Sequence, residues 1–186
     1  KGDDGKFVLH NRLYNAQTFE LIHSKDVLLP FLFEDFLIKD FVISNSGKVS
    51  YWGKHRIHKK KGTDPIIERR LFEIKDTTVT DYLLSDSISV SSSKLIYDRE
   101  QDQAKVVGFY GNAESYGVHG SFIYSASDLS SKSLLINKFP DSFTNDLRES
   151  EQTKGAVSEG FEILRAVPRS DGGMLIIAEQ KEVATQ

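Results

Sequence analysis

A basic segment directly after the aromatic pair Tyr51 and Trp52 holds the densest group of chemically active side chains in the sequence. Clustered cations gain free energy on meeting a polyanion because counterions are released, so the segment could contact phosphate, an anionic glycan or an acidic partner. The alternative is a solvated hairpin edge, where lysines discourage strand-to-strand aggregation. The formal net charge of -3 and the lack of aromatic rings within the run favour this alternative. The segment consists of Lys54, His55, Arg56, His58, Lys59, Lys60 and Lys61.

The five histidines are the main candidates for metal binding, since the sequence contains no cysteine. The missing thiols exclude disulfides, thiolate nucleophiles and sulfur-ligated zinc sites. His55 and His58 are three residues apart, a spacing that puts two side chains on opposite faces of a strand. His10, His23 and His119 are isolated, which is typical of structural or surface histidines. The sequence therefore predicts no metal site and no cofactor.

Carboxylates and hydroxyls are the candidates for catalysis. Glycoside hydrolysis needs two carboxyl groups placed across a cleft, a separation that sequence spacing does not measure. The segment from Asp98 to Asp102 is expected in an exposed turn, and the geometry of a hairpin explains Asp171. The many serines lie outside any Gly-x-Ser-x-Gly elbow, and the glycines from Gly108 to Gly120 precede no helix that could bind phosphate. The acidic candidates are Glu34, Asp35, Asp98, Glu100, Asp102 and Asp171, and together these patterns favour a protein that is not an enzyme.

Aromatic side chains gather in the middle of the chain, between Phe109 and Tyr124. Core packing is the default interpretation, because alternate rings along a strand fill the space between sheets. The other interpretation is a glycan or peptide surface, formed by exposed tyrosines near Asn112 and His119. If such a surface exists, the residues expected to contact the ligand are Tyr51, Trp52, Tyr110, Tyr116 and His119.

Short strands must position all of these residues. Segments rich in β-branched and aromatic residues recur along the whole chain, bounded by Gly, Ser, Asn, Asp or Pro, which is typical of antiparallel β-structure. A helical pattern is weak in both segments that carry one. These are Leu28–Phe36 and Asp141–Glu159, and the polar composition of the second favours a loop over 141–160.

Internal repetition is the most informative feature of the sequence. Six positions recur at a constant separation of 125 residues, and both copies have the pattern of a strand, a glycine-containing turn and a second strand. A third copy aligns Val107–Gly111 with Val49–Gly53, and the segments beginning at Phe7 and Thr18 align with those beginning at Phe122 and Ser133. The six pairs are Phe36 with Phe161, Ile38 with Ile163, Val42 with Val167, Gly47 with Gly172, Val49 with Met174, and Tyr51 with Ile176.

These alignments predict one all-β domain over residues 1–186, built from antiparallel four-stranded repeats of about 60 residues. The third and fourth strands of one unit are expected at 6–30, complete units at 36–85 and 86–140, and first and second strands at 161–180. Such units are typical of propeller blades, and three are fewer than usually close a ring, so the fold is expected to be propeller-like and possibly a partial propeller. A β-sandwich is the alternative, because its hairpins also alternate at short spacing.

Three motifs carry a resemblance to a known group of proteins. They are Gly108–Gly111, Gly117–Tyr124 and Arg169–Gln180, and they resemble uncharacterised bacterial cell-envelope or secreted proteins with β-propeller-like repeats. The resemblance implies an exported location, in the periplasm, on the cell surface or outside the cell, and lends no active site. No apolar run approaches the roughly 20 residues that span a bilayer, and the polar start is expected to be a mature or cut end, without a targeting segment.

The sequence and the resemblance together predict a non-enzymatic binding or scaffold module of the bacterial cell envelope. Its expected partner is another protein or a second copy of itself, and neither nucleic acid nor membrane insertion is expected, given the negative net charge. The competing hypothesis is a glycan-binding or glycan-processing protein, for which the aromatic and acidic loop residues are the motivation.

Overall fold

The computed structural model describes residues 5–58, 64–75, 78–84, 88–112, 115–126, 132–143, 145 and 157–183, and these residues form an all-β structure. Sheet A holds two strands and sheet D holds two, while sheets B and C hold four each, all antiparallel. The strands are β1 (Lys6–Tyr14) and β2 (Leu21–Leu32) in sheet A; β3 (Phe36–Ile43), β4 (Val49–Ile57), β5 (Ile66–Lys75) and β6 (Thr78–Leu83) in sheet B; β7 (Ser89–Asp98), β8 (Gln103–Asn112), β9 (Ser115–Ala126) and β10 (Lys132–Lys138) in sheet C; and β11 (Val157–Pro168) and β12 (Met174–Val183) in sheet D.

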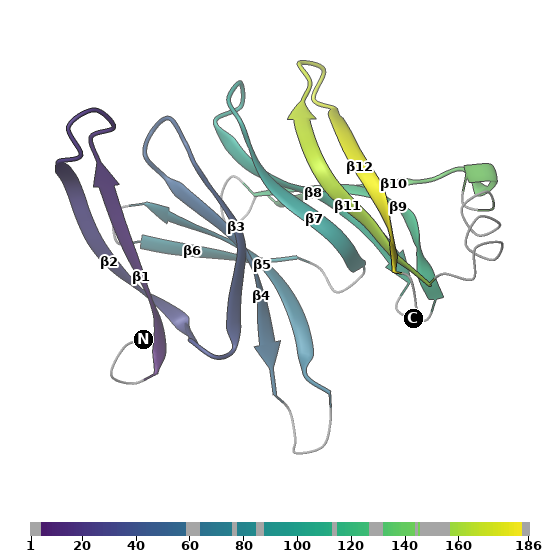
Figure 1. Ribbon diagram of the computed structural model, residues 1–186, viewed down its shortest axis with the longest axis horizontal. Helices are drawn as coiled ribbons and strands as arrows, with labels where there is room; N and C mark the ends of the chain where they lie inside the picture. Colours follow the sequence, from purple (N-terminus) through teal and green to yellow (C-terminus); the bar gives the residue numbers. More distant parts are fainter. Residues whose placement is uncertain are drawn as a thin grey trace.

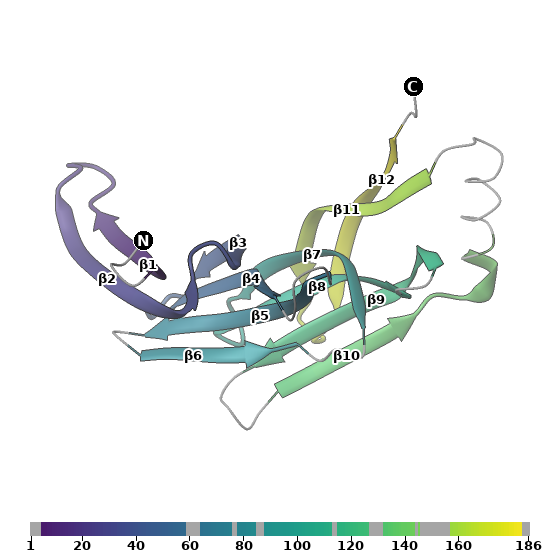
Figure 2. The ribbon, with the colours of Figure 1, turned by 90° about the horizontal axis from the view of Figure 1, so that it is seen from below.

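The four sheets form an open array in the order of the sequence. Figure 1 shows sheet A at one end, sheet D at the other, and the two four-stranded sheets between them. Figure 2 shows the hairpins β1–β2 and β11–β12 rising from the same side of the array. The first strands of the last three sheets, β3, β7 and β11, are in contact with one another in turn. The expected all-β fold with antiparallel four-stranded sheets is therefore confirmed, and the open array is consistent with a partial propeller or with a sandwich.

Three apolar clusters fill the spaces between neighbouring sheets. The cluster between sheets A and B includes Phe31 and Phe72. The cluster between sheets B and C is centred on Trp52 and Phe122, each 1% exposed, and a smaller cluster between sheets C and D includes Phe109. Burial of apolar surface between successive sheets is the main force that holds the array together.

The weak helix candidate at Leu28–Phe36 is wrong, because most of this segment belongs to strand β2. Val27, Leu29 and Phe31 are buried, whereas the residues between them are exposed. This alternation with period two is the pattern of a strand with one buried face, and it gives the segment more buried apolar surface than a helix would. The other candidate segment contains a short helical stretch at 141–143, and β11 begins at Val157, somewhat earlier than the predicted end of the loop.

The repeat separated by 125 residues extends to the details of the backbone. Gly47 and Gly172 both have positive φ, 81° and 82°, a conformation that glycine adopts without steric cost. Each donates its N–H to the carbonyl three residues earlier, Gly47 to Ser44 at 3.0 Å and Gly172 to Arg169 at 3.1 Å. The register shift between Ile38 and Asp40 in the β3–β4 pair also recurs at the equivalent place in the β11–β12 pair.

The alignment of the third copy is wrong by one residue. In sheet B the register shift directly follows the pair of Ile38 with Gly53. In sheet C the equivalent register shift directly follows the pair of Val90 with Tyr110. Gly53 therefore matches Tyr110 and not Gly111. Because side chains alternate across a strand, a slip of one residue exchanges the two faces of the sheet. The corrected register makes Trp52 equivalent to Phe109, and each ring faces the following sheet.

The alignment of the segments at Phe7 and Thr18 with those at Phe122 and Ser133 is not reproduced. It requires Phe7 to pair with Leu21, as Phe122 pairs with Ile136, but Leu21 pairs with Tyr14. The β1–β2 hairpin is longer than expected, and Phe19 lies in its turn with a φ of 58°. Residue spacing along the chain could not show this, because turns of different length join similar strands.

Candidate functional site

The basic segment lies in a central strand of sheet B rather than at an edge. Lys54, His55 and Arg56 belong to β4, which pairs with β3 on one side and β5 on the other. The expectation of a solvated hairpin edge is therefore wrong for these three residues, because both edges of their backbone are hydrogen-bonded. His58 follows the strand and is exposed. Lys59, Lys60 and Lys61 lie outside the described residues.

The two histidines of the segment are paired with separate carboxylates. His55 Nδ1 lies 3.3 Å from Glu68 Oε2, and the His55 ring centroid is 4.8 Å from that of Phe31. His58 Nε2 lies 3.3 Å from Asp35 Oδ1. Within the part of the chain that the structure describes, no three His, Asp or Glu residues are grouped as metal ligands. The pairs act as surface and interstrand contacts.

A polar cluster surrounds Arg70 on the face of sheet B that is turned towards sheet A. The guanidinium contacts Glu68 at 2.6 Å through Nη2, contacts Asp81 through Nη1, and lies 5.5 Å from the Phe31 ring centroid. Burial raises the pKa of Glu68, but hydrogen bonds from Arg70 and His55 outweigh it and leave that pKa lowered. Burial raises the pKa of Asp81 above its ordinary value. Both carboxylates of the cluster contact the guanidinium of Arg70, which suits a structural role.

Basic side chains lie close together on the opposite face of sheet B. Lys54 pairs across strands with Arg69, and burial lowers the pKa of both side chains, with Arg69 and Lys39 lowering that of Lys54 further. Arg69 donates through Nη2 to the Val90 carbonyl at 3.3 Å and so ties sheet B to sheet C. Sequence reasoning missed Arg69 and Lys39 because only the strand register brings them next to Lys54.

The aromatic pair that precedes the basic segment is part of the core. Tyr51 is 7% exposed and donates its hydroxyl to Asn11 Oδ1 at 2.7 Å, which links sheet B to sheet A. Trp52 is 1% exposed and donates Nε1–H to Ser93 Oγ at 2.9 Å, which links sheet B to sheet C. Burial raises the pKa of Tyr51. Both rings therefore join sheets, and the structure does not present them as a ligand surface.

The remaining predicted ligand contacts lie in sheet C. Tyr110 is half-buried, and it pairs with Gly120, where an added Cβ would lie 2.7 Å from the Tyr110 ring. His119 is half-buried in β9, and its carbonyl accepts the N–H of Phe139 at 2.9 Å. The side chain of Tyr116 lies outside the described part of the structure. The structure thus brings Tyr110 and His119 to one strand pair and separates them from Tyr51 and Trp52.

The predicted exposed turn at Asp98 holds a buried ion pair. Asp98 is 3% exposed, and its Oδ2 lies 2.7 Å from Nζ of Lys105, which is 5% exposed. Asp98 Oδ1 also accepts the amides of Glu100 and Gln101 at 3.1 and 3.2 Å. The expectation of exposure is wrong for Asp98, because its carboxylate caps the turn and neutralises Lys105. It holds for Glu100 and Asp102, which are exposed.

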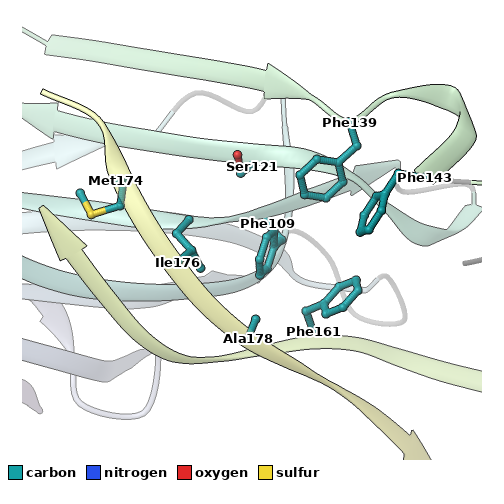
Figure 3. Close-up of a pocket in the computed structure, with 8 residues that line it drawn as sticks. All are labelled: Phe109, Ser121, Phe139, Phe143, Phe161, Met174, Ile176 and Ala178. Carbon is teal, nitrogen blue, oxygen red and sulfur yellow. The ribbon is translucent and has the colours of Figure 1, made fainter. Parts of the chain in front are cut away.

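An apolar hollow of about 310 Å³ opens between sheets C and D. Figure 3 shows the rings of Phe109, Phe139, Phe143 and Phe161 turned towards it from β8, from the residues after β10 and from β11. Ser121 is the one polar residue among the eight that line it. A hollow of this composition accepts an apolar group, and its lining contains one hydroxyl and no acidic or basic side chain.

Apolar side chains are also exposed on the outer face of sheet D and on part of sheet B. On sheet D, Val167 pairs with Leu175, and Ile177 continues the same face; they are 37%, 53% and 47% exposed. On β3, Phe41 and Ile43 are 58% and 54% exposed, although their cross-strand partners are buried or half-buried. Exposed apolar groups of this kind mark contact surfaces.

A comparison of the chain with protein-family models, with curated proteins and with solved structures finds no match in any of the three. None of the helical residues in the described ranges belongs to a helix long and apolar enough to cross a membrane.

Proposed function

We propose that this chain is a non-enzymatic binding or scaffold module of the bacterial cell envelope that makes protein–protein contacts. The location rests on the resemblance of its glycine-rich and C-terminal motifs to envelope and secreted proteins. The protein-binding role rests on one observation, the exposed apolar face of sheet D formed by Val167, Leu175 and Ile177. Exposure of such a face to water is unfavourable, and its burial by a protein partner contributes roughly 25 cal/mol of binding free energy per Å² of apolar area.

The charged clusters support a structural rather than catalytic use of polar residues. Arg70 is neutralised by Glu68 and Asp81, and Asp98 by Lys105. A catalytic centre instead needs groups that face a substrate. The hollow beside Phe109 is lined by apolar side chains and Ser121, and it lies on the inner face of sheet D, opposite the face formed by Val167, Leu175 and Ile177.

A glycan-binding role is the second candidate, and its support is the partial exposure of Tyr110 and His119 on the neighbouring strands β8 and β9, with Tyr110 also packed against the core between sheets B and C. Rings that stack on sugars need an open face, and the burial of Tyr51 and Trp52 removes two of the rings on which this candidate depended. Retention on immobilised polysaccharide tests it, because Tyr110→Ala should abolish retention if glycan binding is the function and leave it unchanged if protein binding is.

The test of protein binding is the mass of the complex that contains this chain when it is purified from the cells that make it, measured by native mass spectrometry. We expect additional polypeptide mass that Leu175→Lys removes, because the substitution puts a charge on the outer face of sheet D. Ile136→Lys is the matched control, since Ile136 is 48% exposed on another sheet. The chain occurring alone, or complexes that survive Leu175→Lys, would contradict the proposal.

A further inference from the structure

Strands β12 and β1 each have one unpaired edge among the described residues. In sheets B and C the second strand pairs with the third, β4 with β5 and β8 with β9. Strand β12 is the repeat of β4, yet β11 is its one described neighbour, and β2 is the one described neighbour of β1. Sheet D thus has first and second strands. The two strands of sheet A directly precede the first strand of sheet B, as β5 and β6 precede β7, and so they take the place of third and fourth strands. The two halves complement one another.

The free edge of β12 carries hydrogen-bond donors in the positions that β4 uses. The backbone N–H of Arg169 donates to the Gly173 carbonyl at 3.0 Å, so these residues form a hydrogen-bonded pair. In an antiparallel ladder bonded and non-bonded pairs alternate, which turns the amides of Met174 and Ile176 away from β11. Their equivalents in the repeat, Val49 and Tyr51, pair with β5. An edge with such unpaired amides is a template for another strand.

The exposed apolar residues lie where the missing halves would pack. The two described strands of sheet A leave part of β3 uncovered, and there Phe41 and Ile43 are exposed. The two described strands of sheet D leave part of β10 uncovered, and there Leu135 is 61% exposed. The outer face of sheet A in turn exposes Leu28 and Leu32. Each uncovered area therefore has an apolar counterpart at the other end of the chain.

We propose that β12 of one chain pairs antiparallel with β1 of a second copy, so that sheets D and A join into one four-stranded sheet. The same contact in both directions closes a ring of two chains with six sheets, within the range of roughly four to eight that closed propellers have. Closure within one chain does not occur in the structure, because sheets A and D lie at opposite ends of the array (Figure 1). This inference rests on the proposed protein-binding function and names its partner.

The faces restrict how the two strands align. Phe7 and Leu9 face sheet B of their own chain. Leu175 and Ile177 must lie on that same side of the joined sheet, where they cover Phe41 of the second copy. Leu28 and Leu32 then lie on the other side, above Leu135 of the first copy. A register shifted by one residue would turn Leu175 and Ile177 away from Phe41 of the second copy, so the pairing is defined by burial.

Light scattering on the purified chain, as a function of its concentration, tests the inference. We expect a mass of twice 21.0 kDa, and we expect Ile177→Lys and Phe41→Lys each to weaken association by about 100-fold, as central interface substitutions do. Ile136→Lys, with 48% exposure against 47% for Ile177, should leave the mass unchanged. A monomer at all concentrations, or a dimer that both substitutions leave intact, would overturn the inference.

Mixing the two variants separates this contact from any other dimer. A mixed pair of Ile177→Lys and Phe41→Lys chains has one junction without a substitution, so we expect dimers to reappear in the mixture but in neither variant alone. Failure to recover dimers would overturn the ring. If the pure chain is a monomer while the complex from cells contains another protein and depends on Leu175, the inference fails and the proposed function stands. If the chain is alone in both measurements, the inference and the proposed function both fail.

Discussion

The buried ion pair between Asp98 and Lys105 allows a quantitative test of the packing of sheet C. In the substitution Asp98→Asn the side-chain oxygen can still accept the amides of Glu100 and Gln101, so the turn keeps its cap. The negative charge is lost, and the ammonium of Lys105, 5% exposed, remains buried without a counterion. Breaking a buried pair in this way costs about 3–5 kcal/mol.

The assay is thermal and urea unfolding of both proteins at pH 7. At roughly 2–4 °C per kcal/mol for a chain of this size, we expect Asp98→Asn to lower Tm by at least about 6 °C. The double variant Asp98→Asn/Lys105→Met should be more stable than Asp98→Asn alone, because it removes the uncompensated charge. A loss below about 1 kcal/mol, or additive effects in the double variant, would refute the argument.

The same pair has a defined pH dependence. Burial raises the pKa of Asp98, but the hydrogen bonds from Lys105, Gln101 and Glu100 outweigh it and leave the pKa below its ordinary value of 3.8. A carboxyl whose pKa is lowered in the folded state contributes stability above the unfolded value and loses it as pH falls through the folded value. The difference in unfolding free energy between wild type and Asp98→Asn should therefore be constant near neutral pH and shrink below pH 3.8.

Two further substitutions test the core between sheets B and C, and a third, in an open turn, is a control. Gly108→Ala places a Cβ 2.5 Å from the Ser92 carbonyl and 2.4 Å from the Phe122 ring. We therefore expect urea unfolding to show a loss of unfolding free energy of about 1–3 kcal/mol. Gly47→Asn lies in an open turn with positive φ, and its loss should be less than about 1 kcal/mol. Burial raises the pKa of Tyr124 from 10.0 to about 12, so its stabilisation is complete below pH 10 and is lost as pH rises towards 12. Wild type should lose its unfolding free energy more steeply than Tyr124→Phe across this range, and parallel curves would contradict the burial of the phenol.

The repeat with a separation of 125 residues was predictable because it leaves both a side-chain pattern and a backbone requirement. Gly47 and Gly172 are conspicuous in sequence since positive φ favours glycine, and the structure has the same turn at both. The third copy has a different turn, between Asp98 and Gln103, and lacks such a marker. Without one, apolar alternation alone aligns two strands equally well at neighbouring registers, and the alignment was wrong by one residue.

The candidate site was less predictable than the fold. Whether Trp52 faces solvent or a neighbouring sheet depends on contacts with Ser93, which is far away in sequence. The cations near Lys54 likewise include Arg69 through strand pairing alone. The exposed face of sheet D has no sequence signature, because Leu175 and Ile177 have the same apolar character as the buried Ile163 of the facing strand. Exposure is a property of the assembled sheets.

Hydrogen exchange of β12, followed by mass spectrometry, tests the central claim that the end of the array is a protein contact surface. Peptides from the central strands β4 and β8 should be protected in every sample, since both their edges are paired. We expect β12 of the associated wild-type protein to exchange more slowly than β12 of the Ile177→Lys variant at the same concentration. Equal exchange of β12 in the two proteins, with β4 and β8 still protected, would contradict the account.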